Sequence, residues 1–324
     1  MKAFFTLVTV LFMGSATLAQ NLPRFSGLMF GDYYYNIKNH DPAQNDMQAF
    51  DYRRIYLTTD YDISDGFTSR FRLESDPGAS TLQNGKLTVM MKDAYLDWKG
   101  LIDNGHVIFG VQGTWNINLA EAIFGYRSLE KTIQDLHGIS ASRDMGISVS
   151  KNFSPAFSAG ILVGNNSGNG LWTNRYKRGY LYIQFRPIRE MIILVDGDYS
   201  GAPSKKYLKT GDIIVAYTNN SFSLGAQAYI QSKDHSQPDG STLTSYGISL
   251  NGWARLVDNL RLVARLDRWD PNTKMSGGVQ NLLLAALDYT VNRNVHIMPN
   301  IETTTYSDGM QSDVTLRGTF YFTF

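Results

Sequence analysis

Residues 313–324 read DVTLRGTFYFTF, and in this stretch every second residue is apolar or small. A period of two is typical of a β-strand that has one apolar face and one polar face. The apolar set is Val314, Leu316, Gly318, Phe320, Phe322 and Phe324. The aromatic Phe324 ends the strand without a polar tail, which favours a strand that closes a β-barrel at a membrane interface. The alternative is an ordinary edge strand of a secreted β-domain.

The N-terminal segment indicates export. Lys2 is followed by an apolar run over residues 3–13 and by small residues that end at Ala19. This order is typical of a secretory signal peptide, and we expect cleavage after Ala19. The apolar run is too short for a helix that spans a membrane. The sequence therefore predicts a signal peptide over residues 1–19 and one exported domain over residues 20–324.

Composition narrows the class of the exported domain. The 324 residues include 30 basic and 29 acidic side chains, and this balance argues against a protein that binds nucleic acid or anionic surfaces. There is no cysteine, so no disulfide framework is expected. The 19 Tyr, 17 Phe and 29 Gly residues suit barrel strands with interfacial aromatic side chains. Composition leaves an outer-membrane barrel and a secreted all-β protein open.

The spacing of the strands favours the barrel. We expect sixteen strands, the first over residues 24–37, each of about nine to fourteen residues and so long enough to cross a bilayer when tilted. The others begin near Phe50, Phe67, Leu87, Gly105, Arg143, Phe157, Gly179, Met191, Lys209, Phe222, Thr242, Leu260, Gln280, Val295 and Asp313. Tight links such as 64–66 alternate with longer polar loops such as 38–49. That alternation is typical of a transmembrane antiparallel β-barrel and is not expected of a β-sandwich.

The third long loop, residues 114–142, is expected to be functional because long loops without a strand of their own usually are, unless they are disordered. Its many apolar residues argue against disorder, and residues 119–124 can form a short helix. Its charged residues include Glu121, Arg127, Glu130, Lys131 and Asp135. We predict a constriction loop that folds into the lumen. The alternatives are a lid over the barrel mouth and a contact with a neighbouring subunit.

Strand register predicts which charges face the lumen, because a charge that faces lipid at mid-bilayer is costly. In the strand from Leu260, for example, the leucines point outward and the charged residues between them point inward. The predicted pore-lining residues are Arg54, Arg70, Arg72, Glu74, Arg186, Arg261, Arg265, Asp267, Glu302 and Arg317. A lumen of mixed charge indicates water and small hydrophilic solutes. The alternative is that these charges pair across the lumen and stiffen the wall.

Several stretches resemble the phosphate-selective porin O and P family. They are FDYRRIYL (50–57) with the hairpin that runs on to Glu74, KDAYLDW (92–98), GVQ (110–112), residues 121–130, and RDMG (143–146). The resemblance covers roughly residues 50–170. It implies a sixteen-stranded outer-membrane porin, commonly trimeric, that conducts small anions or other small solutes. Phosphate-selective members carry a ladder of lumen arginines and a lysine-rich entrance, whereas this chain is balanced in charge, so a general or weakly anion-preferring porin is expected.

Other functional classes find less support in the sequence. The five histidines are scattered and there is no G-x-S-x-G motif, so we expect no enzyme, and no metal site or cofactor is expected. An adhesin or anchoring barrel would have longer or repetitive external loops, but a non-conducting barrel of this kind remains an alternative, as does a phosphate-selective channel. The expected partners are outer-membrane lipid, small hydrophilic solutes or anions, two further copies in a homotrimer, and the barrel-assembly machinery through the strand that ends in Phe324. The expected location is the outer membrane of a Gram-negative-type bacterium.

Overall fold

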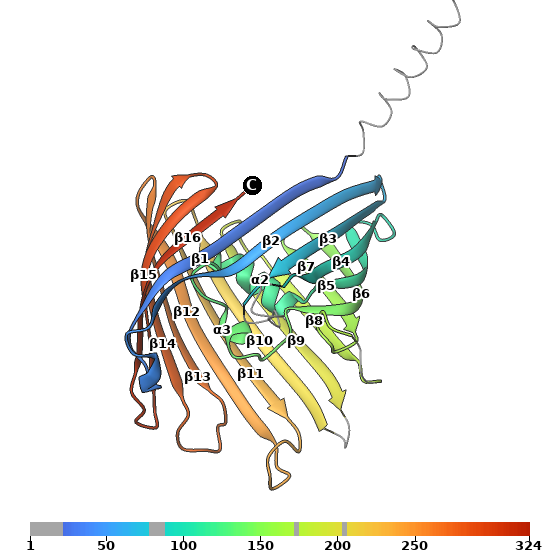
Figure 1. Cartoon of the computed structure of the whole chain (residues 1–324). Coiled ribbons are helices and arrows are strands. Elements are labelled where there is room, and N and C mark those ends of the chain that lie inside the picture. The colour runs from blue at the N-terminus through green and yellow to red at the C-terminus, as the bar shows by residue number, and fades with distance from the viewer. Residues whose placement is uncertain (1–21, 78–87, 172–174, 203–205) are drawn as a thin grey trace, which may run out of the picture.

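The computed structural model describes residues 22–77, 88–171, 175–202 and 206–324. Sixteen antiparallel strands form one closed barrel, in which β1 pairs with β16 and every other strand pairs with its neighbours in sequence (Figure 1). The sixteen-stranded barrel predicted from the sequence is therefore confirmed. The predicted signal peptide, residues 1–19, lies outside the described residues, as does Leu87, the expected start of the fourth strand.

The strand starts agree with the sequence periodicity to within three residues. The strands are β1 (Arg24–Lys38), β2 (Gln48–Ser64), β3 (Phe67–Ser75), β4 (Met90–Lys99), β5 (Gly105–Gly113), β6 (Arg143–Ser154), β7 (Phe157–Gly164), β8 (Arg178–Phe185), β9 (Met191–Ala202), β10 (Lys206–Thr218), β11 (Phe222–Lys233), β12 (Leu243–Val257), β13 (Leu260–Asp270), β14 (Gln280–Asn292), β15 (Val295–Tyr306) and β16 (Asp313–Thr323). Closure pairs every strand edge, so the barrel leaves no open edge for its backbone.

Side chains alternate between the two faces of the wall as the sequence predicts. In β16, Leu316 is exposed on the outer surface, whereas Thr319 is fully buried. In β13, Leu262 and Leu266 are exposed, whereas Arg265 is buried inside. The outer surface is therefore apolar and the interior polar, which is the arrangement that suits a barrel surrounded by lipid. Within the described ranges, no helix is both long and apolar enough to cross a membrane.

The barrel closes where the C-terminal residue meets β1. The backbone N–H of Gly27 donates to the carbonyl of Phe324 (3.0 Å), and the N–H of Phe324 donates to the carbonyl of Gly27 (3.1 Å). A Cβ added to Gly27 would collide with the Phe324 ring, so the ring occupies the space that a side chain at this position would take. The aromatic C-terminus thus packs over the junction of the first and last strands.

Residues 114–142, which we call the inner segment, fold inside the ring of strands (Figure 1). The segment contains the helices α2 (Trp115–Phe124) and α3 (Ile133–Leu136). Helix α2 is capped by Gly125, whose φ of +75° belongs to the left-handed region that glycine adopts without strain. A short 3-10 turn, η2 (Pro42–Gln44), lies in the loop after β1.

Candidate functional site

Inward-pointing side chains from opposite parts of the wall hold the backbone of the inner segment. Arg53 of β2 donates to the carbonyl of Leu129 (2.7 Å). On β11, Gln231 donates to the carbonyl of Ile139 (2.6 Å). Arg265 of β13 donates to a third carbonyl of the segment, that of Lys131. Because these strands are distributed around the barrel, the segment crosses the barrel interior and is fixed at several points.

Apolar contacts hold the same segment against two regions of the wall. Ala120 of α2 packs on Leu194 of β9 and Ile214 of β10, all of them buried. Further along, Phe124 and Leu129 belong to a buried cluster on the inner faces of β13, β14 and β15. The members of this cluster that come from the wall are Val263, Leu282, Leu284, Ala286 and Met298. Burial of this much apolar surface favours one fixed position of the segment.

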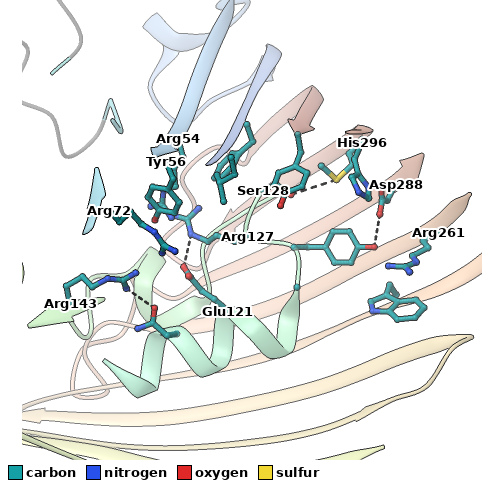
Figure 2. Close-up of a pocket in the computed structure, with 18 residues that line it drawn as sticks. Arg54, Tyr56, Arg72, Glu121, Arg127, Ser128, Arg143, Arg261, Asp288 and His296 are labelled. Atoms are coloured by element: carbon teal, nitrogen blue, oxygen red, sulfur yellow. Dashed lines mark hydrogen bonds and ion pairs between the residues drawn. The ribbon is translucent and has the colours of Figure 1, made fainter. Parts of the chain in front are cut away.

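A cavity of about 410 Å³ remains between the inner segment and the wall formed by β1–β3, β6 and β12–β16 (Figure 2). The charged side chains that line it are Arg54, Arg72, Arg127, Arg143 and Arg261, with Glu121 and Asp288. The lining therefore carries five guanidinium groups and two carboxylates. Figure 2 shows Arg54, Arg72 and Arg143 gathered at one side of the cavity, and Arg261 at the other side near Asp288.

The arginines on the first side are held by carboxylates on the wall behind them. Arg54 lies 2.9 Å from Glu74, which also lies 2.9 Å from Lys92. Arg72 and Arg143 share Asp93, and Arg72 lies 3.3 Å from it. These pairs join nearby strands on one side of the wall and do not cross the lumen, and the guanidiniums still line the cavity.

The inner segment carries an ion pair of its own. Arg127 lies 2.8 Å from Glu121 and 3.5 Å from Asp135. Burial alone would raise the pKa of Glu130, but the guanidiniums of Arg53 and Arg317 lower that pKa below its usual range. Glu130 is therefore expected to be ionised at neutral pH.

Both oxygens of Asp288 have side-chain partners on the second side of the cavity. The hydroxyl of Tyr126 donates to one of its oxygens (3.0 Å), and Nδ1 of His296 lies 2.7 Å from the other. The Arg261 guanidinium lies over the ring of Trp253, at 4.3 Å from the ring centroid. Arg54 and Arg72 of the first side also lie over an aromatic ring, that of Tyr56, but each of them has a carboxylate partner as well.

Three of the ten predicted pore-lining residues line this cavity: Arg54, Arg72 and Arg261. Two of the five charged residues predicted in the loop, Glu121 and Arg127, line it as well. Seven of the remaining charges form local pairs: Arg70 with Asp60, Glu74 with Arg54, Arg265 with Asp267, Arg317 with Glu302, and Asp135 with Arg127. Glu130 accepts from the backbone N–H of Lys131.

The placement of Arg186 within a strand is wrong. Strand β8 ends at Phe185, and Arg186 lies exposed in the turn that follows, where its N–H donates to the carbonyl of Ala156 (2.7 Å). Pro187 comes next, and a proline cannot donate to a strand ladder, so the strand stops before it.

Sequence reasoning missed Arg53 because the strand is irregular there. The pairing of β1 with β2 shifts by one residue between Arg54 and Tyr52, so Arg53 is the extra residue of a β-bulge. Arg53 lies 2.6 Å from Asp32 inside the barrel, next to the inward-pointing Arg54. The sequence does indicate the irregularity, because regular alternation would place one of two consecutive arginines in lipid.

Comparison with known proteins supports the fold. No protein-family model matches the chain, and no curated protein matches its sequence. Among solved structures, it is similar to an anion-selective porin from Comamonas acidovorans, with a TM-score of 0.72, 12% identity, and coverage of 94% of this chain and 100% of that one. It is also similar to OprB of Pseudomonas putida, with a TM-score of 0.70, 12% identity, and coverage of 93% and 94%. The architecture is that of the outer-membrane porins.

A third solved structure is OmpT of Vibrio cholerae, described as an outer-membrane protein in a trimer form, with a TM-score of 0.66, 13% identity, and coverage of 94% of this chain and 99% of that one. Identities this low speak for the fold alone, so the resemblance to the phosphate-selective porin O and P family stays a prediction. In the parts of the chain that the structure describes, no group of three or more acidic or histidine side chains could hold a metal ion.

Proposed function

We propose that this protein is an outer-membrane porin through which small hydrophilic solutes diffuse passively, without a chemical step. The observation that carries the proposal is a closed barrel, apolar outside, whose polar cavity lies beside a segment anchored across the interior. Such a wall keeps lipid out, while the charged cavity retains water and admits polar solutes. The likeness to solved porins supports the same conclusion.

The inner segment, residues 114–142, is proposed to be the constriction of the channel. It is fixed to β2, β11 and β13 by hydrogen bonds to its backbone, so it reduces the open cross-section. The five guanidiniums of the lining exceed its two carboxylates, which favours anions. The preference is expected to be weak, because Glu74 and Asp93 neutralise part of this charge from behind.

Export, membrane insertion and assembly complete the proposed function. Residues 1–19 direct export, and the strand that ends in Phe324 is recognised by the barrel-assembly machinery. The protein then assembles as a homotrimer in the outer membrane. A trimer form described for OmpT of Vibrio cholerae, a barrel of similar fold, supports the assembly state.

The test is planar-bilayer conductance of the purified protein under a gradient of KCl. Stepwise channels with a small anion preference are expected, and Arg72→Glu should shift the reversal potential towards cations because Arg72 lines the cavity. Arg70→Glu is the matched control: Arg70 lies two residues away on β3 and pairs with Asp60 at 2.7 Å, away from the cavity lining. It should move the potential much less.

Two outcomes would count against the proposal. A correctly folded barrel that never conducts would favour a non-conducting adhesin or anchor. Strong block of the current by low phosphate would favour the phosphate-selective channel that the family resemblance implies.

A further inference from the structure

Arg261 differs from the other arginines of the cavity because no carboxylate pairs with it. Across the described ranges, ion pairs hold Arg54, Arg72, Arg127 and Arg143, but none involves Arg261. The lack of a partner has a structural cause. Asp288 lies directly opposite Arg261 in the pairing of β13 with β14, but its two oxygens are turned to Tyr126 and His296, and Arg261 lies beside the hydroxyl of Tyr126 instead.

The Arg261 guanidinium is therefore positioned by an aromatic ring. Its central carbon lies 4.3 Å from the centroid of the Trp253 ring, close enough for a cation–π interaction. Such a contact uses the face of the guanidinium; one N–H lies within hydrogen-bonding reach of the Tyr126 hydroxyl, and the others, which point along the edges, stay available to donate. Arg261 thus presents unused hydrogen-bond donors to the cavity.

Apolar surface lies next to these donors. Trp253 and Tyr321 pack against the buried cluster that includes Met298, and all three line the cavity. Phe30 continues this surface, with its ring 6.5 Å from that of Tyr321. One wall of the cavity therefore combines an arginine that forms no direct ion pair with a patch of aromatic and aliphatic side chains.

We propose that Arg261 and Trp253 form a binding site for small carboxylates that carry an apolar ring or chain. The guanidinium would hold the carboxylate through paired N–H···O bonds, which suit its planar shape. The apolar part of the solute would lie against Trp253 and Tyr321, where it leaves water. A cavity of about 410 Å³ has the size usual for small-molecule sites. The site rests on the proposed function, because a solute reaches it only through an open channel.

Chemistry separates this class of solute from its competitors. A small inorganic anion meets the same guanidinium but gains nothing from the apolar surface. An organic cation of the same shape gains the apolar contact but is repelled by Arg261 and by the arginines opposite it. A solute with both a carboxylate and an apolar part binds best. While it is bound in the cavity, it should reduce the current carried by KCl.

The experiment is single-channel recording in KCl with benzoate, acetate, benzylammonium and inorganic phosphate added separately. Benzoate should reduce the current at a concentration about tenfold below that of acetate, since burial of a ring is worth at least that factor. Benzylammonium and phosphate should have little effect over the same range.

Two variants test the residues themselves. Arg261→Gln should raise the half-blocking concentration of benzoate about tenfold, because a charged hydrogen-bond donor is lost. Trp253→Leu should weaken block by benzoate and leave the effect of acetate unchanged. The matched control is Arg255→Gln: Arg255 lies opposite Arg261 in the pairing of β12 with β13 but is exposed outside the cavity, so block by benzoate should stay as in the wild type.

The outcomes separate this inference from the function on which it rests. If the wild type forms no channels in KCl, the porin function itself fails. If channels form but benzoate acts no better than acetate or phosphate, or if Arg261→Gln leaves the block unchanged, the site is overturned while the porin function stands.

Discussion

Asp196 and Asp212 place two carboxylates side by side in the interior without a cation between them. They are direct partners in the pairing of β9 with β10, and both are buried. In the described part of the chain no ion pair involves either residue, although Gln227 donates to Asp212 (3.1 Å). Two buried carboxylates this close cannot both carry a charge at low cost, so the pair is expected to share one proton.

Asp196→Asn is therefore expected to stabilise the barrel. The substitution supplies an amide that can donate to Asp212 in place of the shared proton, and it removes the cost of holding that proton, a gain of about 1 kcal/mol. Asp198→Asn is the matched control two residues further along β9: Asp198 lies 2.7 Å from Arg178, and its neutralisation should destabilise by about 3 kcal/mol because a buried charge loses its partner. Thermal unfolding in detergent measures both. A lower unfolding temperature for Asp196→Asn would contradict the argument.

Alternation along single strands predicted the face of most residues, because the period of a strand is fixed by its geometry. It failed where the backbone departs from that geometry. Arg53 points inward at a β-bulge, and Arg186 lies beyond a strand that ends before Pro187. The bulge at Arg53 depends on how β2 pairs with β1, and β8 ends because Pro187 lacks a backbone N–H. The alternation of residues within one strand predicts neither feature.

At the scale of elements, continuous apolar runs mark the strands on which the inner segment packs. Residues 191–195 of β9, 213–216 of β10 and 282–287 of β14 do not alternate with polar residues. Leu194, Ile214 and Leu284 are buried beneath the segment, while their neighbours in sequence face outward. A strand covered on both faces is expected to read this way. The strands on which the inner segment packs could therefore be predicted from these apolar runs in the sequence.

The junction of β1 with β16 supplies a prediction about closure. Gly27→Val should hinder closure of the barrel, because the new side chain would occupy the position of the Phe324 ring. The expected loss is about 1–3 kcal/mol, as for overpacking elsewhere. The loss of stability should be measurable by SDS electrophoresis of unheated samples, as a smaller fraction of protein that migrates as the folded barrel.

Gly318→Val is the matched control for this prediction. Gly318 also lies on the outer face, on the partner strand β16, and a Cβ there would meet no atom within 4 Å. Equal yields of folded protein from the two variants would show that barrel closure does not require the Phe324 ring to pack on Gly27.

At the scale of the whole molecule, the charges that meet at the cavity come from strands far apart in sequence. Arg72 of β3, Arg143 of β6 and Arg261 of β13 share one lining only because the barrel closes and the inner segment lies between them. The tilt and stagger of the strands set which inward-pointing residues stand at one height. Sequence periodicity gives the face of a residue but not its height, so it predicted a charged lumen without selecting the residues that gather at the cavity.

The position of the inner segment is expected to depend on pH through His137. Its ring stacks on Trp269 of β13, with 3.8 Å between the centroids. Burial lowers the pKa of His137 to about 4; the Arg265 guanidinium adds to the shift, while the carboxylates of Asp267 and Glu130 oppose it. The packed histidine is therefore neutral, whereas a histidine released to water has a pKa of about 6.5.

This difference fixes the sign of the effect. Because the folded pKa is the lower one, the stabilisation from His137 is complete above about pH 6.5 and is lost as the pH falls towards 4. The channel should give steady currents at pH 7.5 and begin to fluctuate between current levels at pH 4.5, as the segment loosens. His137→Phe keeps a ring for Trp269 but cannot take up a proton, so its currents should be equally steady at both values. Fluctuations that persist at pH 4.5 in this variant would assign the pH dependence to other charges of the lumen.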